Sequence, residues 1–313
     1  MACAASALLL VTAVPARGDD LSEFLERRDR AEFRGEQVVT CTTPEGTIDA
    51  VLDVRQRDGV AYAGRPSGEG HTVAVADGTL SVAYPDGSAD ATTVTTGHPT
   101  VELSARYQTG APEAGRYLGR EVDTVEIQEA DLVRARLDFD RETGALLRFE
   151  VFNGDGSTYC VSRFVNFTPG EPEIPRVVIG SEAIRSLDEQ EAPAHPMVLP
   201  EELAGFRRLD VYGWSEDTVL AYYTDGLFSF TVLHSLRPVE IPEMADAKKV
   251  ESGRRSYLRM FAPGQVVYAW ESTDGGFALF GDLPLDQQEA VLAELPEPGG
   301  PGFLVRIWRK LFR

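Results

Sequence analysis

The feature that most constrains the fold is a pair of alternating segments within residues 133–156, VRARLDFDRETGALLRFEVFNGDG. Apolar residues occupy every second position before the turn RETG, and the alternation resumes after it until a second turn, NGDG. Because successive side chains of a strand point to opposite faces, each segment predicts a strand with one apolar and one polar face. Glycine and asparagine tolerate the left-handed backbone that tight turns need. The stretch therefore predicts consecutive antiparallel hairpins.

The same pattern assigns side chains to faces. The expected apolar face of the first strand holds Val133, Ala135, Leu137 and Phe139, and the expected polar face holds Arg134, Arg136, Asp138 and Asp140. An antiparallel sheet with one apolar face needs a covering layer. That layer could consist of helices, a second sheet or an apolar ligand.

Two β-rich blocks divide the chain, whose 313 residues are enough for two domains. Short β segments separated by Gly, Pro and Asp fill residues 36–167, after a helix that we expect to begin at Asp20. A Pro-rich, acidic stretch follows and allows one short helix near SEAIRSL. The second block ends in a helix, PLDQQEAVLAEL, in which Asp286 is the expected N-cap and Glu289 completes a capping box.

These signals give the following expected division. It consists of a signal peptide at 1–18, a first domain at 19–170, a linker at 171–196, a second domain at 197–298 and a tail at 299–313.

The N-terminus, MACAASALLLVTAVPARGDD, predicts a secretory signal, because a short apolar core precedes small residues at cleavage spacing. It lacks the usual positive residues before that core. Cleavage would remove Cys3 and leave Cys41 and Cys160, both in expected strands of the first domain. In an oxidising compartment this pair predicts one disulfide, and two buried free thiols are the alternative.

The C-terminal tail combines an apolar and a basic face. It carries four positive charges, whereas the whole chain has a net charge of −20. Such a segment suits an anionic membrane surface or a partner's groove, and the alternative is a helix packed on its own acidic body. The acidic chain argues against nucleic acid as a partner. The candidate membrane-contact residues are Phe303, Ile307, Trp308, Arg309, Lys310 and Phe312.

Motifs for catalysis or metal binding are missing from the sequence. Its four histidines stand apart without metal-ligand spacing, and there is no GxSxG and no CxxC. We therefore expect no catalytic residue, no metal and no cofactor, and a binding protein rather than an enzyme.

Two blocks resemble the MucB/RseB family, periplasmic regulators of the envelope-stress sigma factor. One is YYTDGLFSFTV at 222–232, continued by GRRS at 253–256 and FGDLPLDQQEAVLAEL at 280–295. The other is LDFDRETGALLRFEVFNGDGSTYCVSRFVNF at 137–167. The family's basic stretch before the hairpin is replaced here by EADLVRARLD, so contacts made there are not carried over.

The resemblance implies an α+β fold. It predicts an N-terminal antiparallel half-barrel sheet wrapped over helices, as in lipoprotein carriers, and a smaller β-rich C-terminal domain with a terminal helix. It also implies a negative regulator in the periplasm, which binds the periplasmic segment of a membrane anti-sigma factor, shields it from proteolysis and senses lipid or lipopolysaccharide in a hydrophobic cavity. A periplasmic lipid or lipoprotein carrier is the alternative function.

The resemblance further places the anti-sigma peptide between the domains and on the YTDGLFSF stretch. Phe228 and Phe230 are either anchors for the peptide or core residues, and a core role is favoured. The predicted partner-binding residues are Tyr223, Asp225, Gly226, Leu227, Phe228 and Phe230.

Overall fold

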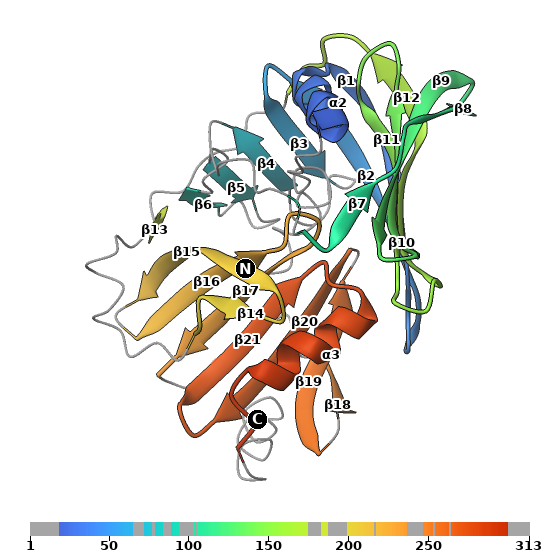
Figure 1. Cartoon of the computed structure of the whole chain (residues 1–313). Helices are drawn as coiled ribbons and strands as arrows, with labels where there is room; N and C mark the ends of the chain where they lie inside the picture. The colour runs from blue at the N-terminus through green and yellow to red at the C-terminus, as the bar shows by residue number, and fades with distance from the viewer. Residues whose placement is uncertain are drawn as a thin grey trace.

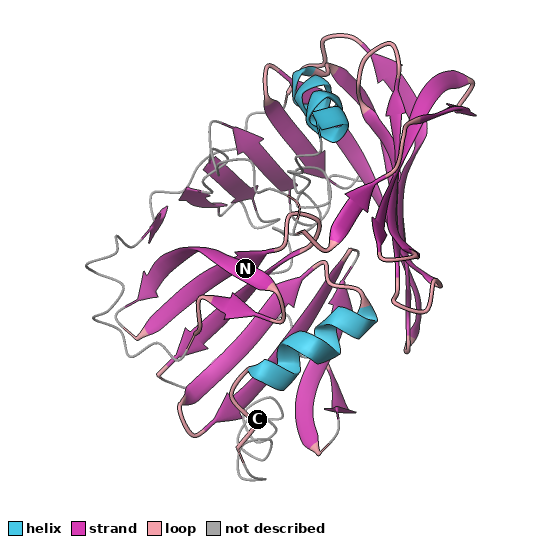
Figure 2. Cartoon of the chain, in the orientation of Figure 1, coloured by secondary structure: helices cyan, strands magenta, loops and turns pink. Residues whose placement is uncertain are grey.

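The computed structural model of the chain describes a small helical content and an extensive β structure (Figures 1 and 2). The described residues are 19–64, 72–76, 79–83, 89–93, 103, 105–174, 183–186, 199–215, 217–236, 247–252, 254–262 and 264–299. Their helices are α2 (Asp19–Arg30) and α3 (Leu285–Glu294). Their strands form two lobes, each built on one antiparallel sheet, as Figure 1 shows.

The first lobe contains β1 to β12. Its strands are β1 (Phe33–Thr43), β2 (Gly46–Arg57), β3 (Val60–Gly64), β4 (Thr72–Ala76), β5 (Thr79–Ala83), β6 (Ala89–Thr93), β7 (Tyr107–Thr109), β8 (Glu113–Tyr117), β9 (Arg120–Glu129), β10 (Leu132–Asp140), β11 (Leu146–Phe152) and β12 (Thr158–Pro169). Both β7 and β8 pair with β9, and the sheet continues through β10, β11, β12, β1, β2, β3, β4 and β5 to β6. The predicted hairpins are confirmed as β10–β11 and β11–β12.

One helix covers the concave side of this sheet. Figure 1 shows α2 lying within the curve formed by β1, β2, β11 and β12. Leu21 and Leu25 are buried there, and the ring of Phe24 stacks on Phe139 with centroids 5.0 Å apart. Burial of each leucine contributes about 1.5–3 kcal/mol. The expected half-barrel wrapped over helical structure is therefore confirmed, with α2 as the helix that the structure describes in this lobe.

The assignment of faces on β10 is only partly correct. Ala135, Leu137 and Phe139 are buried as predicted, but Arg134 and Asp138, expected on the polar face, are buried as well, as is Asp140. The pairing of β10 with β9 shifts register between Val133 and Ala135, so strict alternation fails at Arg134. Asp140 is covered by a bidentate ion pair from Arg120, with N–O distances of 2.7 and 3.0 Å. Ion pairs thus bury part of the polar face.

The second lobe contains β14 to β21. Its strands are β14 (Glu202–Leu203), β15 (Phe206–Ser215), β16 (Thr218–Thr224), β17 (Ser229–Ser235), β18 (Lys248–Ser252), β19 (Arg255–Ala262), β20 (Gln265–Ser272) and β21 (Gly275–Gly281). The order across the sheet is β14, β15, β16, β17, β21, β20, β19 and β18. Helix α3 lies across this sheet in Figure 1, which confirms a β-rich lobe with a terminal helix.

A short strand connects the two sheets. β13 (Ala183–Ser186) pairs in parallel with β6 and antiparallel with β15. It falls within the expected linker at 171–196, where the short helix expected near SEAIRSL is wrong. The sequence AIRS, with its β-branched Ile184, pairs its backbone with the edges of both sheets instead. The domain boundaries themselves stay predictions.

Helix α3 begins differently from its expected cap. Its N-cap is Pro284, which makes no side-chain capping hydrogen bond, and Asp286 lies inside the first turn. The expected capping role of Asp286 is therefore wrong, because its carboxylate is engaged elsewhere, as described below. Val291, Leu292 and Leu295 are buried, as the apolar pattern predicted.

The structure contains the predicted disulfide. Cys41 on β1 and Cys160 on β12 face each other directly, with an S–S distance of 2.01 Å and a sequence separation of 119. The bond closes a long loop within the first lobe, which restricts the unfolded chain and is typically worth about 2–4 kcal/mol.

Several expectations concern residues that the structure does not describe. The signal peptide at 1–18 and the tail residues Phe303, Ile307, Trp308, Arg309, Lys310 and Phe312 lie outside the described residues. Across the described ranges, no helix is long and apolar enough to span a bilayer, and no three metal-ligating side chains are grouped. Within the same ranges His234 is a core residue, stacked on Phe277 at 4.5 Å.

Candidate functional site

The turn between β16 and β17 is organised by its own polar side chains. Asp225 Oδ1 accepts hydrogen bonds from the backbone N–H groups of Leu227 (2.9 Å) and Phe228 (2.8 Å). Thr224 Oγ1 donates to Phe228 O at 2.8 Å and accepts from Gly226 N at 3.0 Å. Gly226 has a φ of 89°, which a side chain would oppose. The sequence TDGLF therefore fixes a rigid turn and leaves Asp225 Oδ2 free for other contacts.

That second oxygen reaches the first lobe. Asp225 Oδ2 accepts a hydrogen bond from the Tyr107 hydroxyl at 2.8 Å and pairs with Arg106 Nη2. The Asp225 side chain has no exposed surface, so its charge depends on these partners. The Arg106 guanidinium also lies over the rings of Tyr107 and Phe206. Burial, and then the Asp225 charge, raise the pKa of Tyr107, so its hydroxyl stays protonated as a donor.

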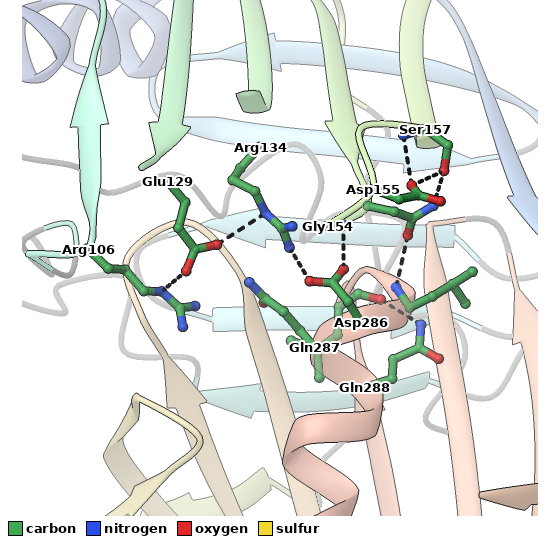
Figure 3. A network of polar contacts seen from close by, with 12 residues as sticks. Arg106, Glu129, Arg134, Gly154, Asp155, Ser157, Asp286, Gln287 and Gln288 are labelled. Atoms are coloured by element: carbon green, nitrogen blue, oxygen red, sulfur yellow. Dashed lines mark hydrogen bonds and ion pairs between the residues drawn. The ribbon is translucent and has the colours of Figure 1, made fainter. Parts of the chain in front are cut away.

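A second bridge joins α3 to the first lobe (Figure 3). Arg134 Nη2 donates to Asp286 Oδ2 at 2.9 Å, and Gly154 N donates to Asp286 Oδ1 at 3.0 Å. Glu129 lies between the two arginines: its Oε2 is 3.5 Å from Arg134 Nε, and its Oε1 is 3.7 Å from Arg106 Nε. Arg134 is only 1% exposed, so its charge requires these carboxylates. The hairpin turn after β11 and the start of α3 are thereby held together.

Two glutamines at the start of α3 complete the junction. With its amide oxygen turned inward, Gln287 accepts from Arg106 Nη2 and from Arg134 Nη2, each at 3.2 Å. Gln288 Oε1 accepts from the Tyr268 hydroxyl at 2.9 Å, and Gln288 Nε2 lies 3.4 Å from the Tyr159 hydroxyl. The side chains of α3 thus connect both bridges into one network between the lobes.

One acid beside this network is partly buried. Asp282, directly after β21, accepts a hydrogen bond from Ser229 N at 2.7 Å. Desolvation by burial raises the pKa of Asp282 to about 7, and the nearby Asp225 charge acts in the same direction. The junction therefore contains one carboxyl group that titrates near neutral pH.

The predicted partner-binding residues lie together at this junction, but they are buried. Tyr223, Leu227, Phe228 and Phe230 belong to the hydrophobic core. Phe230 stacks on Tyr223 at 5.0 Å, and Phe228 packs edge-on against Tyr107 at 6.5 Å. Direct contact between these side chains and a partner stays a prediction, and it would require the lobes to separate.

Sequence reasoning missed the first-lobe half of the site. Arg106 precedes a three-residue strand in an irregular region, and no pattern singles it out. Arg134 follows the alternation and so looked solvent-exposed. Its one distinguishing signal is a position next to the register shift on β10, which the sequence does not reveal.

Among the described residues of the first lobe, a small cavity lies between α2 and the sheet. Its volume is about 20 Å³, and its walls combine Phe33, Val54, Leu146, Phe149 and Phe164 with the polar residues Arg28, Gln37, Gln56 and Ser162. A space of this size holds about one water molecule. The described structure is therefore closed to an acyl chain at this place.

Taken together, the fold is an α+β half-barrel joined through a buried polar junction to a second antiparallel sheet with one helix. The same architecture is found in solved structures of MucB. A chain of the Pseudomonas aeruginosa MucA/MucB complex matches with a TM-score of 0.53 and 21% identity, over 90% of this chain and 100% of that one.

Two further solved structures are similar. MucB in complex with MucA(peri) matches at 20% identity and a TM-score of 0.49, over 90% of this chain and 100% of that one. A structure of MucB matches at 19% identity and a TM-score of 0.49, over 88% and 96%. No known family profile matches the sequence, and no curated protein is found to be similar to it. The resemblance to the MucB/RseB family is thus confirmed at the level of the fold.

Proposed function

We propose that this protein is a regulatory binding protein, exported to the periplasm. It binds the periplasmic segment of a membrane anti-sigma factor, shields that segment from proteolysis and so restrains the envelope-stress sigma factor. The observation that carries the proposal is the fold shared with a chain of the MucA/MucB complex over 90% of this chain. The sequence blocks at 137–167 and 222–232 support it independently of the fold.

The junction is the place where we expect binding to act. A peptide that bridges the lobes would depend on their relative position, which Asp225 and Asp286 fix through Arg106 and Arg134. Since Phe228 and Phe230 are buried, we propose that they support the binding surface from beneath. The basic tail at 299–313 would add contact with the anionic membrane surface.

Lipid or lipopolysaccharide sensing is the second part of the proposal. The half-barrel resembles a carrier's, but the cavity of about 20 Å³ between α2 and the sheet is too small for an acyl chain. Sensing would therefore require α2 to move away from the sheet. The alternative of a lipid or lipoprotein carrier leaves the second lobe without a role.

The proposal is tested with the protein lacking residues 1–18 and the periplasmic segment of an anti-sigma factor from the same organism. We expect the protein and the segment to elute as a complex in gel filtration. We also expect the protease to cleave the segment at least about tenfold more slowly when the protein is present than when it is absent. A variant ending at Gly299 is the matched control, and it should shield the segment equally in the absence of membranes. Equal cleavage with and without the protein would refute the proposal.

The carrier alternative is tested separately by extracting the purified protein with organic solvent. Lipid recovered at close to one molecule per chain would favour a carrier. A protein that shields the anti-sigma segment and yields no lipid would fit the regulator.

A further inference from the structure

A third contact between the lobes lies at the disulfide. The backbone N–H of Gly264, in the turn between β19 and β20, donates to Cys41 Sγ at 3.3 Å. Arg259 on β19 forms an ion pair with Glu45, in the turn between β1 and β2. These partners are 223 and 214 residues apart in the sequence. The Cys41–Cys160 bond therefore lies where the first lobe meets the second, as well as in the core of the first lobe.

The two sulfur atoms are shielded while the lobes are joined. Cys41 and Cys160 are 2% and 3% exposed. Tyr159, the neighbour of Cys160, is also buried, and its hydroxyl lies 3.4 Å from Gln288 Nε2 on α3. Groups of the second lobe thus lie against Cys41 and against the residue beside Cys160. Thiol–disulfide exchange requires a thiolate to reach a sulfur atom, so access to this bond depends on how closely the lobes are joined.

The bond also closes the end of a strand pairing. β1 and β12 pair antiparallel, and Cys41 with Cys160 is the last pair in their register. Beyond it, Thr42 and Thr43 pair with β2, and β1 runs into the turn that holds Glu45. Because pairing frays most readily at its ends, a cross-link there holds the end of β1 against β12. The disulfide thereby fixes the position of a turn that contacts the second lobe.

We propose that the Cys41–Cys160 bond is a redox-sensitive switch on the contact between the lobes. The bond is protected while the lobes are joined and becomes reducible when they separate. Once reduced, it no longer holds the end of β1 in the position that fits the second lobe. The reductant is a dithiol, of the kind that two cysteines of a thioredoxin-like protein present. This switch involves the two lobes alone and does not depend on anti-sigma binding.

The chemistry is a two-step exchange. One thiolate of the dithiol attacks a cysteine sulfur, the Cys41–Cys160 bond breaks, and the other cysteine leaves as a thiolate and takes up a proton. The second thiol of the reductant, having lost its proton, then attacks the mixed disulfide and releases the remaining cysteine. In total, two electrons and two protons pass to Cys41 and Cys160 from the dithiol, which becomes a disulfide.

Reduction acts on the contact between the lobes through Cys41. Two thiols that are no longer bonded move apart to van der Waals contact, which displaces Cys41 Sγ from Gly264 N. The end of β1 also loses its cross-link to β12, and the adjoining turn carries Glu45, the partner of Arg259. The reduced lobes are therefore joined less firmly than the oxidised ones.

The first experiment measures how fast dithiothreitol reduces the protein lacking residues 1–18, whose two cysteines are Cys41 and Cys160. Samples are quenched with acid at intervals, and their free thiols are labelled in denaturant with a maleimide–polyethylene glycol reagent and counted by gel shift. Opening between the lobes exposes less surface than complete unfolding. The logarithm of the reduction rate should therefore rise less steeply with urea than global unfolding does.

Variants tie the reduction rate to the lobes. Glu45→Gln and Asp286→Asn each weaken one ion pair between the lobes, and each should speed reduction at least about tenfold. Glu142→Gln is the matched control, because Glu142 pairs with Arg120 inside the first lobe. It should leave the rate unchanged.

The second experiment compares hydrogen exchange, followed by mass spectrometry, in the oxidised and the fully reduced protein. Peptides that contain Gly264 or Glu45 should exchange at least about tenfold faster after reduction, because the contact between their turns is loosened. Strand β21, central in the second sheet, is the internal control and should exchange at the same rate in both forms. A Cys41→Ala, Cys160→Ala double variant, which cannot form the bond, should behave as the reduced protein does.

Each outcome decides. Equal reduction rates in the original protein, Glu45→Gln and Asp286→Asn would overturn the proposal, as would a urea dependence as steep as that of global unfolding. Unchanged exchange at Gly264 and Glu45 after reduction, or an acceleration that β21 shares equally, would show a purely structural disulfide and would also overturn it. Neither experiment contains an anti-sigma segment, so failure here would leave the shielding test unaffected.

Discussion

At the scale of single residues, the junction depends on buried charges whose partners come from the other lobe. Asp225 has no exposed surface and relies on Arg106 and Tyr107, while Arg134 relies on Asp286 and Glu129. Burying a charge is costly unless it is paired and hydrogen-bonded. Asp282 differs from these residues because a backbone N–H, rather than a cation, faces its carboxylate. Its raised pKa lets pH act on the junction through this carboxyl group.

Asp282 should make the folded state less stable as pH rises through neutrality. Its folded-state pKa of about 7 is raised above the ordinary value near 4, so folding favours the protonated form. The stabilisation is present below about pH 4 and is lost progressively as pH rises to about 7. Asp282→Asn keeps the oxygen that accepts from Ser229 N but cannot ionise.

We therefore expect Asp282→Asn to become progressively more stable than the original protein as pH rises from about 4 to about 7, and to keep that advantage at pH 8, in urea unfolding followed by fluorescence. Asp274→Asn, at an exposed turn of the same lobe, is the control and should not alter the pH profile. Parallel pH profiles for the Asp282→Asn variant and the original protein would contradict this role.

At the scale of elements, the hairpins could be predicted because their signal is local. The turns RETG and NGDG are confirmed at Gly144 and Gly156, with φ values of 79° and 80°. The two glycines nevertheless have different surroundings. A Cβ on Gly144 would lie 2.6 Å from Arg27 Cβ on α2, whereas a Cβ on Gly156 would have no atom within 4 Å. The first turn thus packs closely against α2 and the second does not.

This difference predicts unequal costs for the same substitution. Both Gly144→Ala and Gly156→Ala place a side chain at positive φ, which costs about 1 kcal/mol. Gly144→Ala also forces α2 and the turn apart, so we expect a total loss of about 2–4 kcal/mol. Chemical denaturation of the two variants side by side measures the difference. Equal losses of stability in the two variants would mean that α2 can shift at this contact without a measurable cost.

What could not be predicted follows from long-range pairing. The SEAIRSL segment suggested a helix, but Ala183–Ser186 became a strand because the edges of two sheets lie beside it. Asp286 matched the local pattern of a cap, yet its carboxylate meets Arg134, which is 152 residues earlier in the sequence. Arg134 itself followed a regular alternation that a register shift interrupts. Local patterns specify the elements, while the contacts between lobes depend on a packing that they do not encode.

At the scale of the whole molecule, the question is whether the two lobes unfold as one unit. The bridge from Asp286 to Arg134 and Gly154 joins α3 of the second lobe to β10 and the following turns of the first. Asp286→Asn separates the two possible roles of this residue. Asparagine is as good an N-cap as aspartate, so a capping residue would tolerate the change. A bridging carboxylate would not, because the buried Arg134 guanidinium would lose the closer of its two carboxylate partners and keep only Glu129, at 3.5 Å.

Since the Asp286 side chain is 40% exposed, we expect Asp286→Asn to lower the free energy of unfolding by about 1–3 kcal/mol, less than for a fully buried pair.

Two probes separate the unfolding of the lobes. Tryptophan fluorescence reports the second lobe through buried Trp270, and far-ultraviolet circular dichroism reports both sheets. The two unfolding curves should coincide in the original protein and separate in Asp286→Asn. Glu289→Asn, exposed on the same helix, should leave them coincident. Coincident curves and unchanged stability in Asp286→Asn would mean that the lobes are held together without this bridge, and the junction would then lose its place in the proposed mechanism.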